Sequence, residues 1–184
     1  WLQKTLQLNA AMILFADAKT ISMVRPRRDA TGYPTCYISM SFEDHPYYAK
    51  FYNENKRVVE SNIYRKRIKH PDRIEVQNAK YNILQWGKIE LMRFTLVDLN
   101  PFNSAHVLWV DAGISRFMPK NMPSLAFPNP QIAEKMLDGP RLLISTNYPL
   151  KRIQDSSCKR EHAGLWDSSS FYIGTVLGAS THSV

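Results

Sequence analysis

The chain has 184 residues, enough for about one domain, of which 44% are apolar and 22% charged. These proportions are typical of a globular protein and exclude a disordered chain or a collagen-like fibre. No window approaches the roughly 18 consecutive apolar residues of a membrane span, so the sequence predicts no transmembrane segment.

The formal net charge is +8, from 24 Lys and Arg against 16 Asp and Glu. This surplus favours anionic partners: nucleotides, phosphosugars, acidic glycans, anionic lipid headgroups or nucleic acid. Cys36 and Cys158 form no spaced zinc motif and are expected to be reduced. With no signal segment at its start, the chain is expected to be cytoplasmic, with peripheral contact at the inner membrane face as an extension. Because it begins at Trp1, we expect a fragment of a longer domain.

The first elements are expected within residues 1–40. Residues 2–8 carry three leucines that fit the end of a helix, and the apolar run 10–16 predicts a buried parallel strand ending at Asp17. The prolines and the glycine within 25–34 predict a loop, and residues 36–40 predict a second strand.

Residues 44–73 mix tyrosines with basic side chains, and two interpretations stay open. The aromatic rings and cations could stack and hold a nucleic-acid strand. The other interpretation is a solvated helix and loop with half-buried tyrosines. The absence of an RNA-binding signature favours the second, so nucleic acid is not the expected partner.

The clearest helix is predicted over 81–99, where Ile89, Met92, Leu96 and Leu99 recur at helical spacing. The dipeptide Asn100-Pro101 is expected to end it. Lys88 falls on the flank of this apolar stripe, where it either extends its ammonium to water or points it into a cleft.

The run 107–110 is continuously apolar, which predicts a strand covered on both faces, and it ends at Asp111. An acid at this position lies at the carboxyl edge of a sheet, where open α/β sheets bind ligands. Gly113 is expected to let the backbone turn sharply near the ligand. Farther along, 118–130 predicts an irregular loop, 131–137 a helix, 141–145 a strand and 170–180 a strand broken by glycines. The class is therefore α/β with at least some parallel pairing.

Several stretches resemble a known family. Trp86-Gly87-Lys88, then 100–104, then 109–117 are similar to the bacterial HtrL/YibB family, and 173–178 resembles its glycine-rich strand. The apolar run that ends in Asp111-Ala112-Gly113 also resembles the DxD motif of GT-A-type nucleotide-sugar transferases, with Gly113 in place of the second acid.

The resemblance implies a single GT-A-like, Rossmann-like domain over 1–184, with a mixed, mostly parallel sheet flanked by helices. It implies a glycosyltransferase that moves a sugar from a nucleotide-diphosphate sugar to a glycan or surface-polysaccharide acceptor. A nucleotide- or glycan-binding module without turnover and a basic nucleic-acid binder are the alternatives. The N-terminal strand and the C-terminal part of such a domain are expected to be missing from this chain.

Sugar transfer releases a nucleotide diphosphate, whose developing negative charge needs a divalent cation or basic side chains. Asp111 could bind Mn²⁺ or Mg²⁺ together with another acid, or hydrogen-bond the ribose or donor sugar while Lys88 and Arg116 neutralise the phosphates. It could also be a strand-end cap or pair with Arg116. Trp109 is expected in the core, with stacking on a base or sugar as the alternative. The remaining candidates for ligand binding are Asp17, Gly113, Gly174 and Gly178. The sequence names no residue as the catalytic base.

Overall fold

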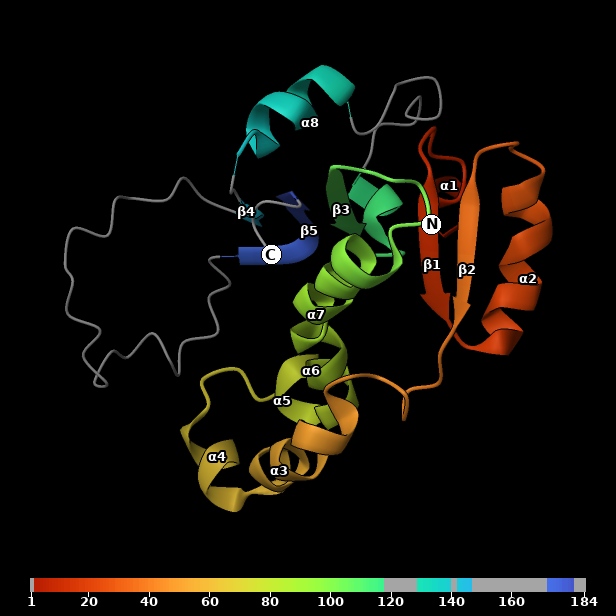
Figure 1. The fold of residues 1–184 in the computed structure, drawn as a ribbon. Coiled ribbons are helices and arrows are strands. Elements are labelled where there is room, and N and C mark those ends of the chain that lie inside the picture. The colour runs from red at the N-terminus through yellow and green to blue at the C-terminus, as the bar shows by residue number, and fades with distance from the viewer. Residues whose placement is uncertain (1, 118–128, 140–141, 147–171, 181–184) are drawn as a thin grey trace.

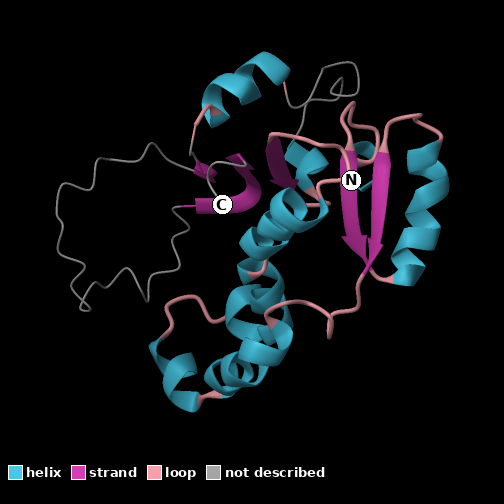
Figure 2. Ribbon diagram, in the orientation of Figure 1, coloured by secondary structure: helices cyan, strands magenta, loops and turns pink. Residues whose placement is uncertain are grey.

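The computed structural model describes residues 2–117, 129–139, 142–146 and 172–180 (Figure 1). The chain contains both helices and strands (Figure 2), which confirms a mixed α/β class. The strands are β1 (Met12–Ala16), β2 (Thr35–Ser39), β3 (His106–Val110), β4 (Leu142–Thr146) and β5 (Tyr172–Ser180). The helices are α1 (Leu2–Thr5), α2 (Ala18–Asp29), α3 (Tyr48–Glu60), α4 (Asn62–Arg67), α5 (Ile74–Gln77), α6 (Ala79–Trp86), α7 (Lys88–Arg93), the π-helix η1 (Phe94–Leu99), the 3-10 helix η2 (Ile114–Phe117) and α8 (Pro130–Leu137).

The strands form two small sheets. Strands β1 and β2 pair in parallel, while β3, β5 and β4 form an antiparallel sheet with β5 in the centre. The prediction of a mostly parallel sheet is therefore wrong for the described strands, because β3 pairs only with an antiparallel neighbour there. Continuous apolarity in 107–110 indicated coverage on both faces, but it carried no information on the direction of the neighbouring strand.

Within residues 1–40, the predicted helix end and both predicted strands are confirmed as α1, β1 and β2. The loop over 25–34 is wrong in its first part, because α2 continues through Arg25 and Pro26 to Asp29. Asp17 starts α2 as its N-cap, and its carboxylate accepts hydrogen bonds from the backbone N and Oγ1 of Thr20. Pro26 lies inside α2 and donates no backbone hydrogen bond, and the last turn of the helix after it brings Arg28 into the protein interior.

Arg28 is completely buried and supports the segment that enters β1. Its guanidinium donates to the carbonyl oxygens of Leu6, Leu8 and Ala10, and its Nε donates to Oγ1 of Thr35 at 2.8 Å. These carbonyls belong to an irregular stretch in which only the Leu8 oxygen also accepts from a described backbone amide, that of Ala10, so Arg28 supplies donors that the backbone itself does not provide. Arg28 therefore fixes the chain between α1 and β1 against α2 and β2.

The predicted helix 81–99 exists as three consecutive segments, α6, α7 and η1 (Figure 1). Its end at Asn100 is confirmed, and Met92 and Leu96 are buried in a cluster with Leu177 of β5. Ile89, however, is 57% exposed, so its assignment to the apolar stripe is wrong. The prediction assumed one regular helix with 3.6 residues per turn. The interruption at Gly87 and the π-helical turns of η1 change which side chains lie on the buried face.

Gly87 is placed where a side chain cannot fit. It follows α6 and precedes α7, and a Cβ built on it would coincide with the imidazole ring of His45. His45, in the loop between β2 and α3, is itself buried. The contact between backbone and ring therefore fixes the β2–α3 loop against the junction of α6 and α7.

We expect Gly87→Ala to lower the free energy of unfolding by about 1–3 kcal/mol, because the new methyl group forces the His45 ring from its position. Urea denaturation measures the change. Gly113→Ala is the matched control, because a Cβ at Gly113 meets no atom within 4 Å, and its stability is expected to stay within about 0.5 kcal/mol of the original. Equal stability of the two variants would contradict the packing argument.

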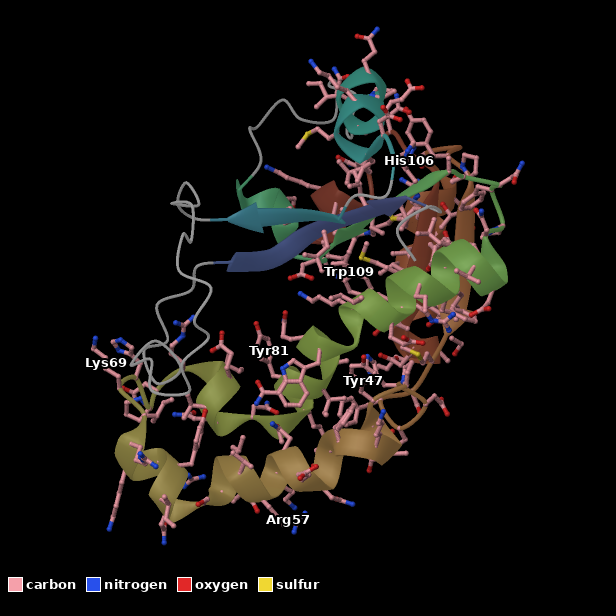
Figure 3. All side chains as sticks on the ribbon, turned by 60° about the vertical axis from the view of Figure 1, so that its left-hand side comes forward. Tyr47, Arg57, Lys69, Tyr81, His106 and Trp109 are labelled. Carbon is pink, nitrogen blue, oxygen red and sulfur yellow. The ribbon has the colours of Figure 1, made fainter. Side chains whose placement is uncertain are left out.

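The aromatic and basic region 44–73 forms the helices α3 and α4 and their connections. Tyr47, Tyr48, Phe51 and Tyr52 are half-buried, as the second interpretation of this region predicted. Their rings pack edge-to-face or stacked, and Phe42 from the preceding loop joins them. Figure 3 shows the basic side chains Arg57 and Lys69 pointing outward, away from Tyr47 and Tyr81.

Candidate functional site

The candidate site is centred on Asp111, which follows the last residue of β3 as predicted. Its carboxylate contacts Lys88, the first residue of α7: Nζ lies 2.8 Å from Oδ1 and 3.0 Å from Oδ2. The indole Nε1 of Trp109, two residues earlier, donates to Oδ1 at 2.7 Å. The three side chains form a cluster, the Asp111 cluster, that joins the end of β3 to the start of α7.

The two partners of the ion pair differ in their access to solvent. Lys88 is 4% exposed, whereas the Asp111 side chain is 27% exposed. Burying an ammonium is costly unless an anion and hydrogen-bond acceptors compensate, and Asp111 supplies both. Lys88 thus does not extend its ammonium to water, so that expectation is wrong, while its role beside a ligand stays a prediction. The accessible group is the carboxylate.

Trp109 connects the site to the hydrophobic core. Val107 and Trp109 pack against the buried cluster of Met92, Leu96 and Leu177, which confirms the predicted core position of the ring. The polar edge of the indole simultaneously orients Asp111, and Lys88 Nζ lies 6.0 Å from the ring centroid. The carboxylate is therefore held by a cation on one side and by a rigid ring fixed in the core.

The backbone after Asp111 is fixed as well. Oγ1 of Thr5 in α1 donates to the carbonyl oxygen of Ala112 at 2.9 Å, and the amide of Ile114 donates to the carbonyl oxygen of Asp111. Gly113 lies in a turn, as expected, and its φ is outside the left-handed region. The position still has open space where a Cβ would lie, so a ligand could approach the backbone there.

The other predicted site residues do not join the Asp111 cluster. Asp17 caps α2 at the end of β1, which belongs to the other sheet, and the hydrogen bonds from Thr20 lower the pKa of its carboxyl. Gly174 and Gly178 lie within β5, whose pairing with β4 is irregular around Gly174: Ile144 pairs with Leu177, but Thr146 pairs with Tyr172. Gly178 is buried and pairs with Leu108 of β3 on one side and Leu143 of β4 on the other, so its observed role is in the sheet.

Two further predictions meet the limits of the described residues. Arg116 lies in η2, but its side chain is outside the described part, and so is a pairing with Asp111. The predicted loop over 118–130 falls largely outside it.

The described residues do not provide a ready site for a divalent cation at Asp111. The ammonium of Lys88 contacts both carboxylate oxygens, so a metal ion would have to displace it and bear its repulsion. Within residues 2–117, 129–139, 142–146 and 172–180, no three His, Cys, Asp or Glu side chains are grouped as metal ligands. Binding of Mn²⁺ or Mg²⁺ therefore stays a prediction that the contacts of Asp111 do not support.

His45 is a buried polar group that the sequence did not single out. The amide of Tyr47 donates to its Nδ1 at 3.3 Å, whereas its Nε2 has no hydrogen-bond partner within the described residues. Burial lowers the pKa of the imidazole. The histidine spacing carried no metal signature, and only the contact with Gly87 identifies this position as structurally important.

The buried imidazole predicts acid-sensitive stability. Because the pKa of His45 is lower when folded than when unfolded, the unfolded chain binds the proton first as the pH falls below about 6.5. We expect a loss of about 1 kcal/mol between pH 7.5 and pH 5.5, measured by urea denaturation at both values. His45→Gln should reduce this loss, whereas His70→Gln, at an exposed position, should leave it unchanged. The same loss in all three proteins would contradict the role of His45.

Fold and site together define a mixed α/β protein whose strand-end carboxylate is held by a buried lysine. Residues 1–160 match the family model HtrL_YibB, described as bacterial protein of unknown function. The chain belongs to this family, which confirms the resemblance seen in 86–117; the matched range ends before 173–178. No curated protein and no solved structure matches the chain. Among the described helices, none is long and apolar enough to cross a membrane.

Proposed function

We propose that the protein is a glycosyltransferase of GT-A type that moves a sugar from a nucleotide-diphosphate sugar to a glycan acceptor. The observation that carries the proposal is the Asp111 cluster: a strand-end carboxylate that is fixed by Lys88 and Trp109 and still 27% exposed. An ionised carboxylate accepts hydrogen bonds from sugar and ribose hydroxyls. Because its position is fixed before the ligand arrives, little ordering entropy is lost on binding.

The charge of the cluster suits a doubly anionic donor. A lone carboxylate would repel the diphosphate, whereas the Lys88–Asp111 pair is neutral overall and the whole chain carries +8. In the transfer, the bond between the anomeric carbon and the phosphate oxygen breaks, and its electron pair leaves with the nucleoside diphosphate. The acceptor hydroxyl oxygen forms the new bond to that carbon and releases its proton to solvent. Asp111 holds donor hydroxyls during this exchange.

The test is donor binding by thermal shift and calorimetry with UDP-, GDP- and CMP-sugars, with and without Mn²⁺. At least one donor is expected to raise the melting temperature. Asp111→Asn should weaken that donor about tenfold or more, since the amide keeps the shape but loses the charge-assisted hydrogen bonds. Asp72→Asn, which removes the same charge at an exposed position, should leave the affinity unchanged.

Gly113→Leu separates binding from folding. Its side chain would enter the open space at Gly113, two residues after Asp111, so donor affinity should fall while the melting temperature without ligand is retained. Absence of any donor binding by the original protein, with and without Mn²⁺, would overturn the proposal. Donor binding without hydrolysis or transfer would contradict the enzymatic part and favour a binding module.

A further inference from the structure

A cavity of about 540 Å³ lies within the helical layer formed by α3, α4, α5 and α6. Helices α3 and α6 pack against each other, and Figure 3 shows their side chains meeting between the ribbons. None of the predicted site residues lines this cavity, so it is distinct from the Asp111 cluster. Its size is within the range of pockets that bind small molecules.

The walls of the cavity combine aromatic rings with acidic groups. Phe51, Tyr64 and Trp86 supply three rings, and Trp86 is 48% exposed at its edge. Glu54 and Glu75 supply two carboxylates, and the lining contains neither lysine nor arginine. In a chain with a net charge of +8, this is an unusual concentration of negative charge.

The two carboxylates are not equivalent. Glu75 lies 3.4 Å from Nη2 of Arg73, which offsets its charge. Glu54, one turn after Phe51 on α3, takes part in no ion pair or hydrogen bond within the described residues. Glu54 is exposed, so solvent screens its charge, but a cation bound there would still gain electrostatic energy without breaking a described pair.

Hydrogen bonding inside the cavity also favours a donor. Nδ2 of Asn82 donates to Oδ1 of Asn55 at 3.2 Å and to the carbonyl oxygen of Glu75 at 2.8 Å. Both partners are acceptors, so the orientation of the Asn82 amide is determined and its Oδ1 remains as an acceptor. The side-chain amides of the lining are neutral and can both donate and accept hydrogen bonds, so they do not select the charge of a ligand. We expect Glu54 to select it.

We propose that this cavity binds a small organic ammonium ion that carries an apolar ring. The ring would pack against Phe51, Tyr64 and Trp86, whose faces also attract a cation, and the ammonium would donate to Glu54 and Asn82. This site is independent of the glycosyltransferase proposal, since it shares no residue with the Asp111 cluster.

Three ring compounds of nearly equal shape test the charge preference: benzylammonium, benzyl alcohol and benzoate. Their dissociation constants are measured by ligand-observed NMR and tryptophan fluorescence at low ionic strength, where screening is weak. Benzylammonium is expected to bind about fivefold or more tightly than benzyl alcohol, and benzoate most weakly. n-Butylammonium, which has no ring, should bind more weakly than benzylammonium.

Two matched variants locate the effect. Glu54→Gln should bring benzylammonium and benzyl alcohol to within about twofold of each other, because it removes the charge and keeps the shape. Glu60→Gln, on the same helix but outside the cavity, should preserve the preference. Trp86→Ala should weaken both compounds. Equal or tighter binding of benzoate, a preference that survives Glu54→Gln, or n-butylammonium binding as tightly as benzylammonium would overturn the proposal.

Discussion

Replacing Arg28 by methionine is expected to lower the free energy of unfolding by about 3–5 kcal/mol. Methionine fills a similar length of apolar space, but it removes the Arg28 donors from the carbonyl oxygens of Leu6, Leu8 and Ala10. Among the described hydrogen bonds, only the Leu8 oxygen keeps a second donor, the amide of Ala10. Each carbonyl group that is left without a donor costs about 1 kcal/mol or more. Equilibrium urea denaturation, followed by circular dichroism, measures the change.

Arg27→Met is the control for this prediction, because it removes the same charge from the adjacent, exposed position of α2. Its effect should stay within about 0.5 kcal/mol. Arg28→Lys should lie between the two, since a lysine keeps the charge but loses the planar set of donors that reaches several carbonyls. Equal effects of Arg28→Met and Arg27→Met would show that the hydrogen bonds contribute nothing.

The second large effect is expected at the Lys88–Asp111 pair. Asp111→Asn leaves a buried ammonium without its counter-ion and should cost about 2–4 kcal/mol, less than for a fully buried pair because Asp111 is partly exposed. Lys88→Met should cost a similar amount. The double variant should cost clearly less than the sum, since neither partner is then left alone, with a coupling energy of about 1.5 kcal/mol or more measured by urea denaturation.

The surface pair Lys56–Glu60 is the matched control for this cycle. Its atoms lie 3.9 Å apart and both side chains are at least half exposed, so the coupling in Lys56→Met/Glu60→Gln should be below about 0.5 kcal/mol. Equal couplings in the two cycles would contradict a special role of burial. Donor affinity measured on the folded Lys88→Met protein then separates the role of the pair in stability from its role in donor binding. Unchanged affinity would mean that the pair contributes to stability only.

Local patterns were sufficient for much of the secondary structure. Apolar runs predicted β1 and β3, and the spacing of Met92 and Leu96 predicted the long helical region that ends at Asn100. The failure over 25–28 has a specific reason: Pro26 and three arginines look like a loop, but the helix is extended by the buried contacts of Arg28. Those contacts join residues 18 to 22 positions apart, which no local pattern contains.

The sequence predicted which residues belong to the site, but it did not predict how they contact one another. Asp111 and Trp109 were assigned to their strand, and Lys88 was recognised as an unusual cation near an apolar stripe. The sequence could not show that Lys88 and Asp111 pair across 23 positions, because the packing of α7 against β3 depends on contacts between elements far apart in the chain. The pairing considered from sequence, with Arg116, was the one nearest in the chain.

The sequence by itself determined the mixed α/β class, the family through the residues around 86–117, and the carboxylate that follows the buried strand, since apolar periodicity and short motifs are properties of neighbouring residues. Only the tertiary structure decided that Lys88 is buried against that carboxylate, that Gly87 admits the ring of His45, and that Glu54 faces an aromatic cavity without a counter-ion. Each of these depends on groups from different elements meeting in space. The free energy of a charged or polar group depends on its burial and its partners there, which the neighbouring residues in the chain do not specify.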